Sequence, residues 1–128
     1  MRLSVTLTAR TRKHDLRFAV RAGLEAEMLA LEQAAIVEAD RAIYSQPEGS
    51  YKRTWLFRDS LHYGHPLNIW NITQRGARYG TKVFYAKFLE FGTKFMYARE
   101  VLIRARENHR QELEEAFHRG FDKELRSM

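Results

Sequence analysis

The stretch HDLRFAVRAGLEAEMLALEQAAIVEADRAIY, residues 14–44, decides the fold of this chain. The spacing of its apolar and alanine residues, three or four positions apart, places them on one face of a helix. Pro47 and Gly49, in SQPEGS directly after the stretch, make its continuation unfavourable. The stretch therefore predicts one long amphipathic helix over 14–44. Its apolar stripe consists of Leu16, Val20, Leu24, Met28, Leu31, Ala35, Ala39 and Ala42.

The segments around this helix predict a small sheet. LSVTLT, residues 3–8, alternates apolar and polar residues, which is typical of a short strand with one buried face. YKRTWLFRDSLH, residues 51–62, favours a helical turn. LNIWNITQRG (67–76) and YGTKVFYA (79–86) predict an antiparallel hairpin whose turn lies near RGARYG, residues 75–80.

A second long helix is predicted near the end of the chain, over 98–126. Its apolar stripe would consist of Leu102, Ala105, His109, Leu113, Ala116, Phe117, Gly120 and Phe121. The element order predicts an α+β fold, in which a small antiparallel sheet packs against a long N-terminal and a long C-terminal helix. At 128 residues, we expect one domain over 1–128.

Composition excludes some functions. The chain has no cysteine, so it forms no disulfide and performs no thiolate chemistry. It has no apolar run long enough for a signal peptide or a membrane span. We therefore expect the chain to be made and used in the cytoplasm, with no membrane partner.

The net charge of +6 is unevenly distributed. Cations dominate residues 1–21 and 45–94, whereas acids dominate residues 22–44. Such segregation is compatible with a nucleic-acid-binding protein. It is equally compatible with a subunit whose opposite faces meet copies of itself.

The sequence contains few features that indicate catalysis. His62 and His65, in HYGHP, have no second ligand pair to complete a metal site. No glycine-rich phosphate loop and no nucleophile elbow is present. Glu90 stands in an apolar setting, where burial would raise its pKa towards that of a general acid. Alternatively, it accepts backbone N–H groups near a chain turn, and we favour this role. We predict no catalytic residue, no cofactor and no metal, and hence no enzyme.

Nucleic-acid binding is a stronger alternative. SYKRTWLFR (50–58) and RGARYGTKVFYAK (75–87) interleave cations with aromatic rings, a mixture that binds phosphates and stacks on bases. The same aromatic residues are equally suited to the core of a small domain. They are Trp55, Phe57, Trp70, Phe84 and Phe88. A small basic nucleic-acid-binding protein or toxin-type nuclease is the alternative function.

YAKFLEFGTKFMYAREVLIRA, residues 85–105, resembles the signature of tail-completion and head–tail joining proteins of long-tailed bacteriophages. That signature is Tyr-Ala, an apolar pair and Glu-Phe-Gly-Thr, followed by Met and Ala-Arg before a C-terminal helix. The residues in register are Tyr85, Ala86, Glu90, Phe91, Gly92, Thr93, Met96, Ala98, Arg99, Leu102 and Ala105.

A second segment, YKRTWLFRDSL, resembles the Thr-Gly-x-Leu-Arg-x-Ser-Ile stretch of the same family. It matches in type at Thr54, Phe57, Arg58, Ser60 and Leu61. The chain departs from the family pattern at five positions. Trp55 replaces a common glycine, and Lys87 replaces a common proline. Prolines are also replaced at Tyr97, Glu100 and Arg104.

The resemblance implies that the Glu-Phe-Gly-Thr corner connects the sheet to the last helix. We expect Gly92 to adopt a positive φ. We expect Glu90 to accept turn amides or to contact a neighbouring cation. We also expect Tyr85, Phe88 and Phe91 to pack into the core.

The resemblance further implies a structural virion protein of a phage neck, assembled in the host cytoplasm. Its expected form is a ring, a hexamer, that terminates the tail tube and joins it to the head. The implied partners are the tail tube protein and the head-completion or portal-adaptor proteins, with non-specific contact to genomic DNA in the channel.

A closed ring needs two different complementary faces on each subunit. Charge segregation suggests an acidic face in section 25–40 and a basic face in sections 51–58 and 75–87. The candidate interface residues are Glu32, Glu38, Arg53, Arg58, Arg75, Arg78 and Lys82.

Overall fold

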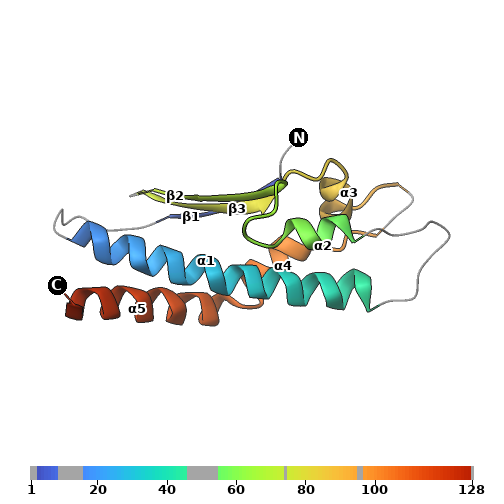
Figure 1. Ribbon diagram of the computed structural model, residues 1–128. Coiled ribbons are helices and arrows are strands. Elements are labelled where there is room, and N and C mark those ends of the chain that lie inside the picture. The colour runs from blue at the N-terminus through green and yellow to red at the C-terminus, as the bar shows by residue number, and fades with distance from the viewer. Residues whose placement is uncertain (1–2, 9–15, 46–54, 74, 95–96, 128) are drawn as a thin grey trace.

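The structure is a computed structural model that describes residues 3–8, 16–45, 55–73, 75–94 and 97–127. The predicted α+β class is confirmed, because a three-stranded antiparallel sheet is combined with a long N-terminal and a long C-terminal helix (Figure 1). In chain order the elements are β1 (Leu3–Thr8), α1 (Arg17–Ala39), the π-helical turn η2 (Asp40–Tyr44), α2 (Leu56–Ser60), β2 (Asn68–Ile72), β3 (Gly76–Thr81), α3 (Ala86–Phe91), α4 (Val101–Glu107) and α5 (Arg110–Ser127).

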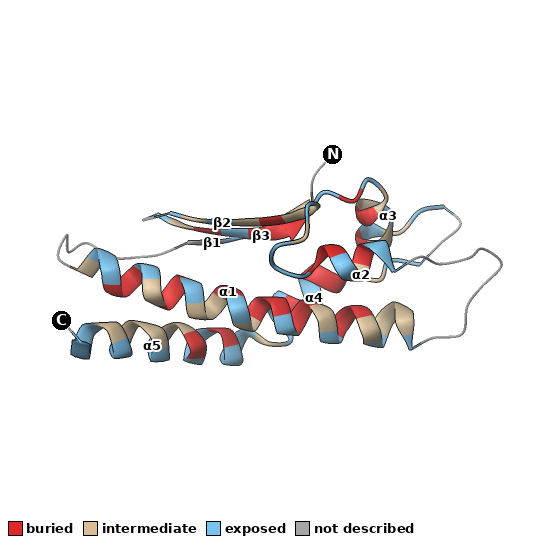
Figure 2. Cartoon of the chain, in the orientation of Figure 1, coloured by how far each residue is buried: buried red, intermediate tan, exposed pale blue. Residues whose placement is uncertain are grey.

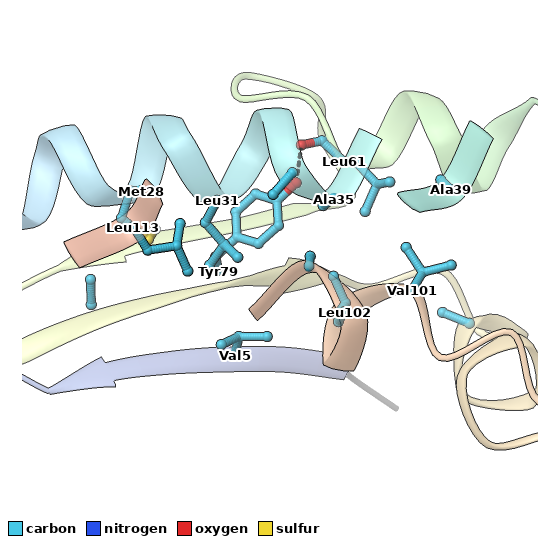
Figure 3. Packing of buried hydrophobic residues seen from close by; sticks show 14 of the residues in the cluster. Val5, Met28, Leu31, Ala35, Ala39, Leu61, Tyr79, Val101, Leu102 and Leu113 are labelled. Atoms are coloured by element: carbon cyan, nitrogen blue, oxygen red, sulfur yellow. Dashed lines mark hydrogen bonds between the residues drawn. The ribbon is translucent and has the colours of Figure 1, made fainter. Parts of the chain in front are cut away.

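Strand β3 is the centre of the sheet, with β1 and β2 antiparallel on either side. Val5, Tyr79 and Trp70 lie opposite one another in register, and all three belong to the core or pack against it. Tyr79 is fully buried, and its hydroxyl donates to the carbonyl of Leu61 at 2.5 Å (Figure 3). The predicted strand at 3–8 is thus confirmed, with Val5 in the core.

Helix α1 forms the middle layer of the molecule, with the sheet on one side and α5 on the other (Figure 1). Because it packs on two sides, it needs a wide apolar surface. The predicted helix over 14–44 corresponds to α1 and η2 together, over residues 17–44. Its buried apolar side chains are Ala19, Val20, Leu24, Met28, Leu31, Ala34, Ala35 and Ala39.

The predicted final helix over 98–126 is two helices. α4 ends at Glu107 and α5 begins at Arg110, with a turn between them. α4 packs against α1, α3 and β1, whereas the long contact of α5 is with α1. The predicted helix is therefore interrupted, because α4 and α5 pack in different layers of the molecule. Helix α4 starts later than predicted, because Glu100 has a left-handed backbone (φ 48°, ψ 43°).

The predicted hairpin is present, but its turn lies between Ile72 and Gly76 and not within 75–80. The N–H of Thr73 donates to the carbonyl of Gly76 at 2.8 Å and closes this turn. GARYGT is strand β3, although two glycines make it resemble a turn. A Cβ on Gly80 would collide with the carbonyl oxygen of Leu3, so this glycine permits the close approach of β1.

Candidate functional site

The segment that resembles the phage signature builds a corner between α3 and α4. Glu90, in α3, is 1% exposed, and its carboxylate points at the first turn of α4. Oε1 accepts the N–H of Leu102 and Oε2 accepts the N–H of Ile103, both at 2.8 Å. The first N–H groups of a helix have no partner within the helix, so one buried carboxylate satisfies two of them. The expectation that Glu90 accepts backbone amides is confirmed.

The backbone reinforces the same corner. The N–H of Arg99 donates to the carbonyl of Leu89 at 2.6 Å, and the N–H of Glu100 donates to the carbonyl of Glu90 at 3.1 Å. These bonds satisfy carbonyl groups in the last turn of α3, which have no hydrogen-bond partner within the helix. Gly92 follows α3 with φ 76°, so its predicted positive φ is confirmed. The corner is thus closed by both side-chain and main-chain bonds.

Burial raises the pKa of Glu90, and the amides of Ile103, Leu102 and Val101 oppose that rise by favouring the carboxylate. A general acid must reach a substrate atom. Both oxygens of this buried carboxylate instead accept backbone N–H groups of the same chain. Its geometry is that of a structural helix cap.

The outer side of the same corner carries three exposed phenylalanines, here called the phenylalanine ridge. Phe84 is 74% exposed, Phe88 is 41% exposed and Phe91 is 64% exposed. Phe88 and Phe91 belong to α3, and Phe84 lies in the turn directly before it. Figure 2 shows buried and exposed residues side by side on this short helix. A cation borders the ridge, because the amine of Lys87 lies 5.2 Å from the ring of Phe88.

The prediction that Phe88 and Phe91 pack into the core is therefore wrong, whereas Tyr85 does pack against the core. Ala86 and Glu90 are the buried residues of α3, and their i, i+4 spacing defines its inner side. With Glu90 facing inward to reach α4, Phe88 lies on nearly the opposite side of the helix, and Phe91, about 100° from Glu90, is exposed as well. Among the other signature residues, Thr93 and Ala98 are exposed, and Arg99 is half-buried. Met96 lies outside the described residues.

The two acids assigned to a subunit interface are internal. Glu32 is 8% exposed, and its carboxylate accepts the N–H of Tyr63 at 2.5 Å. Glu38 is 1% exposed and lies 2.9 Å from Nε2 of His109. Both face other parts of the same chain, so the assignment of Glu32 and Glu38 to a subunit contact is wrong. A count of charges along the sequence cannot distinguish the inner from the outer side of α1.

Arg58 is also engaged within the chain. Its guanidinium donates two hydrogen bonds to Asp40, at 2.6 and 3.0 Å. Its backbone N–H donates to the hydroxyl of Tyr44 at 3.2 Å, and the ring of Tyr44 stacks on Trp55 at 4.7 Å. These contacts join the predicted helical turn, which is α2, to the end of the long helix. Because Arg58 is held by these contacts, charge reversal at this residue is expected to destabilise the monomer itself.

Three of the other predicted cations lie in the β2–β3 hairpin or directly after it. Arg75, Arg78 and Lys82 are exposed, and Arg53 lies outside the described residues. Arg78 stands in register with Thr6 and Asn71, on the face of the sheet opposite to Tyr79. A shallow hollow here is lined by Thr6, Asn71, Thr73, Arg75, Gly76, Ala77 and Arg78.

Within the described parts of the chain, no group of three His, Asp or Glu side chains is placed to hold a metal ion. His62 is exposed, whereas Nδ1 of His65 accepts the N–H of Leu67 at 3.1 Å. Of the aromatic residues weighed for the core, Phe57 is buried, Trp70 is half-buried and Trp55 is 55% exposed. None of the described helices is long and apolar enough to cross a bilayer.

A second exposed apolar surface was not predicted from the sequence. It is a hollow between α1 and β2, here called the α1–β2 hollow. Leu29 and Tyr63 are 54% and 65% exposed there, and Tyr63 packs on Trp70 with ring centroids 4.7 Å apart. Its residues come from three separate segments, so no local pattern marks it. The lining is Arg21, Glu25, Leu29, Tyr63, Trp70, Asn71 and Ile72.

Comparison with family models, with curated proteins and with solved structures found no match to this chain.

Proposed function

We propose that this protein is a structural subunit of a bacteriophage neck, which forms a ring that terminates the tail tube and joins it to the head. The sequence resemblance over 85–105, with its second segment over 51–61, supports the phage assignment. The observation that carries the structural role is the phenylalanine ridge on the corner which that signature builds.

A row of exposed phenylalanines is costly for a protein that works alone. Each ring left in water forgoes part of the roughly 1.5–3 kcal/mol that burial of a large apolar side chain supplies. Exposed apolar surface of this kind marks sites of protein–protein contact. The Glu90 cap and the positive φ of Gly92 hold the ridge on a rigid corner, which reduces the ordering cost of binding. The signature thus combines an inner structural residue with an outer contact surface.

The proposal needs no catalysis and no cofactor. Its partners are further copies of the chain in a hexameric ring, the tail tube protein and the head-completion or portal-adaptor proteins. Its site of action is the virion neck.

Electron microscopy of particles assembled without this gene product, and then with it added back, tests the proposal. Full heads with separate tails that join on add-back are the expected result. Overlong tails in its absence would further assign it as the terminator. Normal joined particles in its absence would reject the neck role.

The hairpin arginines favour a second candidate function, which is contact with a nucleic-acid backbone. Arg75 and Arg78 are exposed around one polar hollow, and exposed cations attract phosphates without reading sequence. The test is binding of the purified chain to duplex DNA at several salt concentrations. Loss of binding in Arg75→Gln/Arg78→Gln, with a shallower salt dependence, would support it. Unchanged binding, or none in the wild type, would reject it.

A further inference from the structure

We propose that the phenylalanine ridge of one copy docks into the α1–β2 hollow of the next copy. This inference rests on the proposed ring, because it assigns the two surfaces through which the subunits meet. The occupant of the hollow is thus a second copy of this chain, through Phe84, Phe88 and Phe91.

The two surfaces lie in the right places for a head-to-tail contact. Figure 1 shows α3 at one end of the sheet and the β2–β3 hairpin turn at the other end. The hollow reaches that hairpin end, where a guanidinium nitrogen of Arg21 lies 3.3 Å from the carbonyl oxygen of Ile72. A contact between two different surfaces is heterologous, and repetition of such a contact generates a ring when the rotation closes.

The chemistry of the two surfaces matches. The hollow offers the ridge an exposed leucine, Leu29, and a tyrosine–tryptophan pair. Phe18 is 71% exposed and shares one side of α1 with Glu25 and Leu29, at i, i+7 and i+11, so a further exposed apolar side chain lies on this side of α1. Phenylalanine rings pack well against aromatic and branched apolar side chains.

The area is sufficient for a substantial part of an interface. Burial of the exposed parts of the three ridge rings removes roughly 350 Å² from water on one partner, from the size of an aromatic side chain. A standard interface buries about 800 Å² on each partner. The ridge therefore supplies close to half of one side.

Charge favours ridge-to-hollow contact over ridge-to-ridge contact. A two-fold contact of ridge against ridge brings Lys87 close to its own copy, which is repulsive. The rim of the hollow instead carries Glu25, which is 53% exposed and pairs with Arg21 at 3.2 Å. Because Arg21 and Glu25 are paired, the rim carries no net charge, so docking avoids the Lys87–Lys87 repulsion of a ridge-to-ridge contact.

Disulfide trapping tests the contact directly, because the natural chain contains no cysteine. Lys87→Cys, beside the ridge, is mixed with an affinity-tagged Leu29→Cys, in the hollow, and the mixture is oxidised. The matched control mixes Lys87→Cys with a tagged Val37→Cys. Val37 is also an exposed apolar residue of α1, at 44%, but it lies outside the hollow. Unfolding midpoints of the three variants verify that each one folds.

The expected result is that the Lys87–Leu29 heterodimer forms about tenfold faster than the Lys87–Val37 heterodimer, because docking raises the local concentration of the two thiols. Equal rates for the two mixtures, or fastest formation of the Lys87→Cys homodimer, would overturn the docking.

Electron microscopy distinguishes the failure of the docking from the failure of the neck role. If the chain restores neck joining but the specific disulfide fails to form, the docking is wrong and the neck role stands. If the disulfide forms but joining is not restored, self-association stands and the neck role is wrong.

Discussion

The carboxylate of Glu90 lies 2.8 Å from the backbone nitrogen of Leu102, so a side chain in α3 forms the N-terminal cap of α4. The second carboxylate oxygen binds Ile103 at the same distance. Because Glu90 and Leu102 are buried, loss of the carboxylate leaves the N–H of Leu102 without a partner inside the protein.

Glu90→Gln tests this cap. Glutamine is nearly isosteric, but it has one acceptor oxygen and an NH₂ group that would face an N–H donor. We expect a loss of about 1–3 kcal/mol in the free energy of unfolding, measured by denaturant titration. Glu100→Gln is the control, because Glu100 is half-buried and its side chain makes an ion pair with Arg104 at 3.6 Å. Equal stability of wild type and Glu90→Gln would contradict the role of this carboxylate.

His109, in the turn between α4 and α5, gives the protein a pH-dependent contact. Partial burial lowers the pKa of His109, but the hydrogen bonds and charges of Glu38 and Glu112 outweigh this effect, so the net pKa is raised above 6.5. A raised histidine pKa contributes stability that is fully present below pH 6.5 and is lost as the pH rises through the folded-state value. Arg41, 3.1 Å from Glu38, is the other charge at this contact.

His109→Gln should therefore cost about 1–2 kcal/mol of unfolding free energy near pH 6, as expected for a hydrogen bond between charged groups. The cost should shrink as the pH is raised towards about 9, because loss of the imidazole proton becomes more favourable above the raised folded-state pKa. Denaturant titrations of both proteins at the two pH values give the comparison. A cost that is the same at both values would show that the protonated ring contributes nothing. His118→Gln, an exposed change on α5, controls for general effects of losing a histidine.

Glu27 is expected to weaken the contact between α1 and α5 at alkaline pH. Its pKa is raised to about 7, first by burial and then by the negative charge of Glu114. The folded-state pKa of Glu27 exceeds the unfolded value of 4.5. The contribution of this group to stability is therefore fully present below pH 4.5 and is lost as the pH rises through 7.

Glu27→Gln removes this penalty. At pH 8 we expect the variant to be more stable than the wild type by about 1 kcal/mol, a figure reduced for the partial exposure of the group. At about pH 4, where the wild-type carboxyl is protonated in the folded state, the two should be equal. Glu25→Gln, two residues earlier and 53% exposed, should stay within about 0.5 kcal/mol of wild type at both values. A Glu27→Gln variant that is no more stable than wild type at pH 8 would refute the prediction.

Charge reversal is expected to affect the stability of the protein differently at Arg58 and at Arg78, although both were predicted to be interface residues. Arg58→Glu breaks the bidentate pair with Asp40 and brings two acids together, so we expect a loss of about 1–2 kcal/mol in unfolding free energy. Arg78→Glu changes an exposed residue on the outer face of the sheet and should stay within about 0.5 kcal/mol. Thermal or denaturant unfolding measures both, and equal effects would contradict the distinction.

The long helix and the first strand could be predicted because each has a hydrophobic period that persists over its whole length. The first part of strand β3 was predicted as a turn, because its pattern is disguised by Gly76 and Gly80, and glycines also occur in turns. A glycine is needed at position 80 because β1 packs closely against it, and these two segments are distant in sequence. The break at residues 108–109 is also tertiary, because the pattern on either side continues helically while α4 and α5 pack in different layers.

For the candidate site, the role of Glu90 could be predicted from its chemistry, but the direction of its neighbours could not. Helix α3 has six residues, too few to define an apolar side by periodicity. Glu32 and Glu38 were misassigned for a related reason. Their internal partners, the N–H of Tyr63 and the ring of His109, are distant in sequence.

The most direct test of the central claim combines the ridge with particle assembly. Neck-deficient particles are supplied with wild-type chain, with Phe84→Ser/Phe88→Ser, or with Leu125→Ser. Leu125, in α5, is 42% exposed, close to the 41% of Phe88, and lies outside the ridge and the hollow. The fraction of heads joined to tails is counted by electron microscopy. We predict that wild type and Leu125→Ser restore joining, while the folded double variant does not. Joined particles in the absence of the chain, or full restoration by the double variant, would contradict the account.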